Sequence, residues 1–278
     1  MVNDVFTSRI TLIDGSVRGA SHIRSGMPNQ DSYKTAKLPE AIILAAADGH
    51  GSKSSPFSKT GSTIAVNVFC GILAQYLENY ANNLDTLASF LLREGDTTVA
   101  HAIDSEWKCR VEKAHKRRAL SVIRTVTDGT DNVDIWRQYG TTLLGVAITP
   151  SFYFAFQLGD GDILFLDDNG VRYPVRPEKL LGTETYSLSH SDAWKKAVAT
   201  VGPCRSEATR CALMLATDGF ANSYSNEASF LNACEDYYAT IKEHGAEAVR
   251  KNLKGWLNET SAGGSGDDIT VMFAVIEN

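Results

Sequence analysis

The stretch AIILAAADGHG, residues 41–51, joins an apolar run to an Asp-Gly-His-Gly turn. A short apolar run that stops at such turn residues is typical of a buried β-strand. The pattern recurs along the chain and predicts strands in ITLIDG (10–15), AIILAAAD (41–48), TTLLGVAIT (141–149), FYFAFQLG (152–159), DILFL (162–166), CALMLATD (211–218) and ITVMFAVI (269–276).

Between these strands, apolar residues at helical spacing predict helices over residues 57–80, 84–125, 227–244 and 246–260. Turn residues such as Thr149-Pro150-Ser151 separate neighbouring strands, which favours hairpins and antiparallel sheets. We therefore predict an α+β fold with layers α/β/β/α, a central antiparallel β-sandwich flanked by pairs of helices. We expect a single domain over residues 1–278, with an irregular flap at about 171–210.

Composition narrows the functional classes. The formal net charge of −6 argues against a nucleic-acid partner, because such binding needs an excess of Lys and Arg. The five cysteines are scattered and form no C-x-x-C pair, which disfavours a disulfide framework or a zinc site. The sequence starts with neither a basic segment nor an apolar run, and we find no stretch close to the ~18 apolar residues of a membrane span. We expect a cytoplasmic protein with no membrane partner.

Aspartates stand at four of the predicted strand ends, each beside glycine. They are Asp48, Asp160, Asp218 and Asp267. One Asp-Gly pair alone is more often a turn than a ligand. Four carboxylates converging at one sheet edge would repel one another unless a cation lay among them. Hard oxygen ligands without a Cys/His cluster favour Mg²⁺ or Mn²⁺, and the sequence does not choose between the two.

These motifs together resemble the protein phosphatase 2C family of metal-dependent (PPM-type) phosphatases, most of all its compact bacterial members. The resemblance spans nearly the whole chain and rests, in order, on Pro28-Asn29-Gln30-Asp31, Asp48-Gly49-His50-Gly51, Gly140-Thr141-Thr142, Gly159-Asp160-Gly161, Ala216-Thr217-Asp218-Gly219-Phe220 and Gly266-Asp267-Asp268-Ile269-Thr270.

The resemblance implies a serine/threonine protein phosphatase, a hydrolase that acts in signal transduction by dephosphorylation. It implies hydrolysis of phosphoserine and phosphothreonine by direct attack of a water that bridges two Mn²⁺ or Mg²⁺ ions. A third ion is known at such centres. The implied partners are a phosphorylated protein substrate and a cognate serine/threonine kinase.

The resemblance also implies a ligand set. Asp48 would bridge the two ions, with the Gly49 carbonyl completing one of them. Asp218 and Asp267 would hold the first ion, and Asp31 would bind or orient the water around the second.

Other positions keep two interpretations. Asp160 matches the position of the third-ion ligand, although Gly161 replaces the usual serine and a plain turn is equally compatible. Asp268 stands where Asn is frequent, so we leave it out of the ligand set. By resemblance His50 is the general acid that protonates the leaving alkoxide, and the alternative is a loop histidine bound to a carboxylate.

The phosphate anchor departs from the family pattern. Many members place an arginine three residues before the Asn, where this chain has Gly26. Arg24 is the preferred replacement because its guanidinium binds two phosphoryl oxygens at once, and His22 is the second candidate. The alternative for Arg24 is an exposed loop arginine.

Two rival functions share these features. A small-molecule or nucleotide phosphoesterase would use the same metal centre with a deep pocket for the organic group. A non-catalytic phosphoprotein-binding module would be expected to lack one or more of Asp48, Asp218 and Asp267, and all three are present. The basic run 108–118 is interpreted as a solvated helix face, with a docking face for an acidic phosphoprotein as the alternative.

Overall fold

The fold is a sandwich of two antiparallel β-sheets, seen in a computed structural model that describes residues 6–121, 132–176, 185–204 and 210–277. Within these ranges each sheet has five strands, and all the strand pairs are antiparallel. The first sheet has the order β1 (Ile10–Val17), β10 (Ile269–Glu277), β9 (Arg210–Ala216), β6 (Asp162–Asp167) and β7 (Gly170–Arg172). The second has the order β2 (Ser32–Leu38), β3 (Ala41–Ala47), β4 (Leu143–Ile148), β5 (Phe152–Leu158) and β8 (Val198–Pro203).

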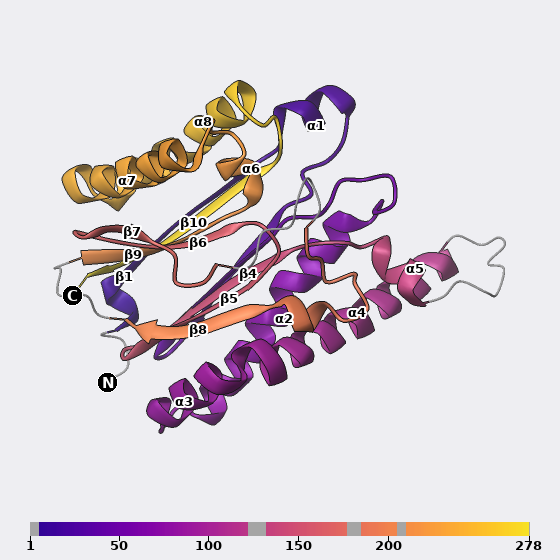
Figure 1. The fold of residues 1–278 in the computed structure, drawn as a ribbon, viewed down its shortest axis with the longest axis horizontal. Helices are drawn as coiled ribbons and strands as arrows, with labels where there is room; N and C mark the ends of the chain where they lie inside the picture. Colours follow the sequence, from indigo (N-terminus) through magenta and orange to yellow (C-terminus); the bar gives the residue numbers. More distant parts are fainter. Residues whose placement is uncertain (1–5, 122–131, 177–184, 205–209, 278) are drawn as a thin grey trace.

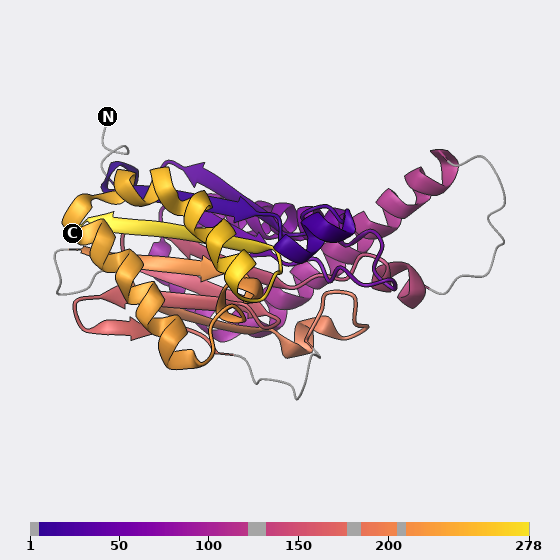
Figure 2. The same ribbon diagram turned by 90° about the horizontal axis from the view of Figure 1, so that it is seen from above.

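Helices cover the outer face of each sheet, so that the predicted α/β/β/α layers are confirmed (Figure 1). α7 and α8 lie on the first sheet, while α2, α3 and α4 lie on the second. The helical elements are α1 (Ala20–Ser25), α2 (Ser58–Asn79), α3 (Leu84–Glu94), α4 (Ala100–Ser121), α5 (Asn132–Arg137), α6 (Asp218–Ala221), α7 (Glu227–His244) and α8 (Ala246–Gly263). Short helical turns occupy Thr7–Arg9 and Ala193–Lys196, and a π-helical turn, Gly95–Val99, joins α3 to α4. The C-terminal part of α4 extends past the sheets (Figure 2).

Three hydrophobic cores hold the four layers together. Strand β3 contributes to two of these cores, because all seven of its residues are buried and successive side chains point to opposite faces of the sheet. Ile43 packs toward the helices α2 and α4, whereas Leu44 packs toward the other sheet. The third core lies between the first sheet and α7 and α8, where Phe273 and Leu253 meet. Continuous apolar runs therefore mark strands that are covered on both faces.

Helix α2 is, among the described residues, long and apolar enough to span a membrane, and half of that window is buried inside the protein. The sequence pattern predicted a helix over residues 57–80, but the expectation that no stretch comes close to a membrane span did not hold for it. Its Phe69 and Leu73 are fully buried against the second sheet. The apolar composition of α2 is therefore accounted for by its place in the core.

Three details of the sequence prediction were wrong. Strand β2 was missed, because its residues are half-buried and include two lysines. The predicted helix over 84–125 is divided by the π-helical turn, and 122–125 lie outside the described residues. The flap at 171–210 contains the end of β7 and the whole of β8, which pairs with β5. Residues 177–184 and 205–209 of that flap lie outside the described part of the chain.

Candidate metal centre

The register of the strands brings the aspartates to one edge of the sandwich. Asp48 directly follows β3, and Asp218 begins α6 just after β9. Asp160 lies in the turn between β5 and β6, while Asp31 and Asp267 precede β2 and β10. Because antiparallel neighbours alternate in direction, the end of one strand lies beside the start of the next.

The electrostatics of these carboxylates show that they converge. Burial raises the pKa of Asp48 well above its ordinary value, and four neighbouring carboxylates raise it further: Asp218, Asp31, Asp267 and Asp160. Burial, followed by Asp160, Asp267 and Asp31, raises the pKa of Asp218 to about 8. Asp48 and Asp218 are therefore held where ionisation of the neighbouring carboxylates opposes their own.

Asp31 lies deepest in this cluster. Burial raises its pKa to about 6, although hydrogen bonds from Thr270 and Thr217 act in the opposite direction. Thr217 Oγ1 donates to Asp31 Oδ2 at 2.7 Å, and Lys59 Nζ donates to the Asp31 carbonyl. The other carboxylate oxygen, Oδ1, is buried and has no hydrogen-bond partner among the described residues. A buried acceptor of this kind is suited to a cation.

The backbone of Asp48 is held in place by two threonines of the neighbouring strand. The Asp48 N–H donates to Thr142 Oγ1 at 3.0 Å. The Asp48 carbonyl accepts from Thr141 Oγ1 at 2.6 Å and from the Thr142 N–H at 2.9 Å. Gly49 is buried and pairs with Thr141, and a Cβ on it would lie 2.8 Å from the Gln30 carbonyl oxygen. The Asp48-Gly49 segment therefore has little freedom to move.

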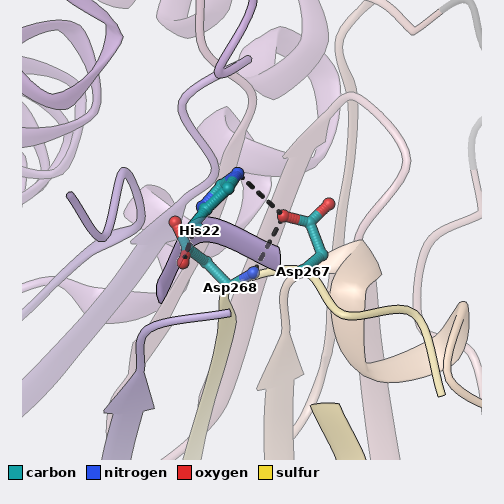
Figure 3. A group of neighbouring side chains, drawn as sticks. All are labelled: His22, Asp267 and Asp268. Carbon is teal, nitrogen blue, oxygen red and sulfur yellow. Dashed lines mark hydrogen bonds and ion pairs between the residues drawn. The ribbon is translucent and has the colours of Figure 1, made fainter. Parts of the chain in front are cut away.

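Asp268 binds the segment that leads to Asp31. Its two carboxylate oxygens accept the N–H groups of Gly19 and Gln30, each at 2.6 Å. His22 lies between Asp268 and Asp267, with Nδ1 2.9 Å from Asp268 Oδ1 and Nε2 3.8 Å from Asp267 Oδ1 (Figure 3). Asp268 is 3% exposed, so it faces the protein interior. Its oxygens are occupied by backbone donors, which makes it a structural partner of the site.

His50, two residues after Asp48, lines a cavity. Burial, with a smaller contribution from His190, lowers the pKa of His50 to about 4. The same cavity is lined by His190 and several serines. The sequence offered no signal for His190, because it lies more than a hundred residues from His50 in a segment without a pattern.

The two candidate phosphate anchors are placed differently. His22 is directed toward Asp267 and is 17% exposed. Arg24 is exposed near the end of α1 and makes none of the hydrogen bonds or ion pairs recorded among the described residues. The structure thus brings His22, and not Arg24, next to the carboxylates.

The donor set fits a divalent cation. Its carboxylates come from five separate strand ends. In the described part of the chain no lysine or arginine forms an ion pair with Asp48 or Asp218. Oxygen-rich, strongly negative sites of this kind suit Mg²⁺ or Mn²⁺.

Comparison with known proteins agrees with this geometry. The sequence model described as Protein phosphatase 2C matches residues 18–258. The Mycobacterium tuberculosis serine/threonine phosphatase PstP/Ppp is 17% identical, with 97% of this chain and 99% of that chain covered and a TM-score of 0.58. The PstP catalytic domain in complex with two manganese ions is 18% identical, with 96% and 99% covered and a TM-score of 0.55. RsbX in complex with magnesium is 13% identical, with 96% of each chain covered and a TM-score of 0.53. A search of curated protein sequences finds no match.

Proposed function

This chain belongs to the protein phosphatase 2C family, and we propose that it is a metal-dependent serine/threonine protein phosphatase. The observation that carries the proposal is the convergence of four carboxylates, Asp31, Asp48, Asp218 and Asp267, in which Asp31 is buried and Asp267 is partly exposed. Such an arrangement costs stability in the absence of a cation, because each ionised carboxylate disfavours the others.

The ligands that we assign come from this chain alone. Asp48 would serve both ions, and the Gly49 carbonyl would complete one of them. Asp218 and Asp267 would hold the first ion, and Asp31 would serve the second. Asp160, which is exposed, is the candidate ligand for a third. When bound, the ions supply an activated water and neutralise charge on the phosphoryl oxygens. Manganese or magnesium is proposed because solved structures of the same fold contain one or the other.

Two histidines would act on the substrate. We assign His50 as the proton donor to the leaving serine or threonine oxygen, because it follows Asp48 by two residues and lines the adjoining cavity. Its burial favours the neutral imidazole, so a bound phosphoryl group, whose negative charge favours the imidazolium, must be seated first. His22 and Arg24 remain the candidates for holding that phosphoryl group, and the position of His22 beside Asp267 favours His22.

The cellular setting is proposed from the same features. The five cysteines are not joined by disulfides, and four of them are buried, which suits the reducing cytoplasm. The substrate would be a phosphorylated protein, with a serine/threonine kinase as the opposing enzyme. The net charge of −6 gives no support for a nucleic-acid partner.

The test is release of phosphate from phosphoserine and phosphothreonine peptides, phosphotyrosine peptides, nucleotides and an aryl phosphate. We expect activity with Mn²⁺ on the first two classes and none in excess chelator. Asp48→Asn and Asp218→Asn should each reduce turnover by about 100-fold or more and weaken Mn²⁺ binding, because each removes a charged ligand.

Asp14→Asn is the matched control, since Asp14 is an exposed carboxylate on β1, and it should behave like the wild type. Circular dichroism would confirm that each variant is folded. Full activity in excess chelator, or a normal rate in Asp48→Asn, would refute the proposal. Efficient turnover of nucleotides alone would favour the small-molecule phosphoesterase instead.

A further inference from the structure

A polar cavity of about 600 Å³ is lined by His50 and not by Asp48. Three segments line it: the loop after β3, the end of α5 and residues 185–191. The described lining residues carry hydroxyl, imidazole or guanidinium side chains and include no carboxylate: His50, Ser52, Ser54, Ser55, Arg137, Thr185, Ser187, Ser189, His190 and Ser191.

The walls of this cavity are fixed by hydrogen bonds. Ser55 Oγ donates to the Arg137 carbonyl at 2.7 Å, which joins the β3 loop to α5. Ser187 Oγ accepts from the Thr141 N–H at 3.1 Å, which joins the third segment to the strand edge that holds Asp48. Because these contacts link the walls to the sheet, the cavity keeps a fixed position relative to the metal ligands.

A buried ion pair holds the wall of the cavity that is formed by residues 185–191. Lys108 Nζ lies 2.9 Å from Asp104 Oδ2 and donates to the Ser191 carbonyl at 2.6 Å. Both side chains are less than one-tenth exposed. The pair fixes residue 191 to α4, so this wall is not a loose loop at that point.

Gly140 lies where the three segments meet. A Cβ at this position would lie 2.6 Å from His50 Cδ2, 3.1 Å from Ser55 Oγ and 3.3 Å from Ser189 Oγ. Any side chain at residue 140 would therefore push His50 or the serines out of place. The absence of a Cβ allows the imidazole and the hydroxyls to surround one space.

The charge of the cavity differs from that of the whole protein. The chain carries a formal charge of −6. Among the described lining residues, by contrast, the permanently charged side chain is that of Arg137, which is positive and exposed. Among the described residues Arg137 has no carboxylate partner. Thr185 Oγ1 is buried there without a hydrogen-bond partner among these residues. Unpaired donors of this kind suit an anion.

We propose that this cavity is a substrate subsite for an anionic group, a carboxylate or a second phosphoryl group, carried close to the phosphorylated residue. The proposal rests on the proposed phosphatase function. His50 connects the two sites, since it follows Asp48 on the metal side and lines the cavity on the other. The substrate class is thus an acidic or doubly phosphorylated segment of a protein, held by Arg137 and the surrounding hydroxyls.

The experiment compares kcat/KM for four phosphothreonine peptides. Their flanking positions carry neutral residues, aspartates, a phosphoserine or lysines, and three ratios are taken relative to the neutral peptide. The wild type should prefer at least one anionic peptide over the neutral one. Arg137→Ala should reduce that preference by about fivefold. Arg137→Glu should reverse it and favour a lysine-flanked peptide. Added salt should weaken the wild-type preference for anionic peptides, because the ion pair between Arg137 and the peptide anion would be partly exposed to solvent.

Arg93→Ala serves as the control, because Arg93 is an exposed arginine of α3 that does not line the cavity, and it should keep the wild-type ratio. An active enzyme whose three ratios are unaffected by either Arg137 variant would overturn the subsite alone. An enzyme that hydrolyses none of the phosphopeptides with Mn²⁺, while correctly folded, would overturn the phosphatase function on which the subsite rests.

Discussion

Replacing Asp268 by asparagine tests whether this carboxylate organises the N-terminal side of the site. The side chain is 3% exposed and accepts the N–H groups of Gly19 and Gln30 at 2.6 Å. Asparagine has nearly the same shape, but it carries one acceptor oxygen and one amide nitrogen. The nitrogen would meet a backbone N–H that it cannot accept.

The magnitude follows from these two bonds. A hydrogen bond to a charged group contributes about 1.5–3 kcal/mol, and a neutral one about 0.5–1.5 kcal/mol. The asparagine variant loses two hydrogen bonds to a charged group and keeps one hydrogen bond to a neutral group, which costs roughly 2–5 kcal/mol. Relief of the repulsion between Asp268 and Asp31 offsets part of this, so we expect a loss of about 2 kcal/mol. For a domain of this size that corresponds to a fall of about 4–8 °C in Tm.

The assay is chemical denaturation in excess chelator, together with hydrogen exchange of the Gly19 and Gln30 amides. Asp267→Asn is the matched control, because the Asp267 side chain is 47% exposed and its Oδ1 can still accept from the Asp268 N–H. The control should keep the stability of the wild type and lose Mn²⁺ affinity. If Asp268→Asn unfolds within about 0.5 kcal/mol of the wild type and its two amides stay protected, Asp268 does not organise this segment.

Two further predictions concern the groups that would touch the substrate. His50→Gln should lower turnover of alkyl phosphate esters by at least about tenfold more than turnover of aryl esters, because a good leaving group needs less protonation; equal losses on both would remove His50 from the acid role. His22→Ala should raise the KM for phosphopeptide and weaken inhibition by free phosphate, each by an amount equivalent to about 1.5–3 kcal/mol. Arg24→Ala should change neither quantity. If Arg24→Ala has the larger effect, the phosphate anchor is Arg24.

The carboxylate cluster was predictable because strand ends are visible in the sequence. An apolar run that stops at Asp-Gly places the aspartate at the sheet edge, and the antiparallel register then determines which edges meet. Asp48 and Asp218 follow β3 and β9 in this way. Strand β2 was missed for the opposite reason. Lys34 and Lys37 interrupt its apolar pattern, since this edge strand is covered on one side only.

The role of Asp268 was not predictable from any local pattern. Its partners Gly19 and Gln30 are 249 and 238 residues away in the chain. The pairing of β1 with β10, which places Val17 opposite Ile269, brings Gly19 close to Asp268 in the folded chain. A carboxylate that neighbours a candidate metal ligand therefore has two possible functions, and the position of backbone donors decides between them.

The groups proposed for catalysis and the groups proposed for substrate selection lie on different kinds of structural element. The carboxylates proposed as metal ligands lie at strand ends, where the sheet fixes them. Arg137 and His190 lie on a short helix and a loop, held by contacts such as the one from Lys108 to the Ser191 carbonyl, 83 residues apart. Loops accept substitutions that strands do not. Related chains can therefore keep the carboxylates and still differ in Arg137, and such chains would differ in the substrates that they select.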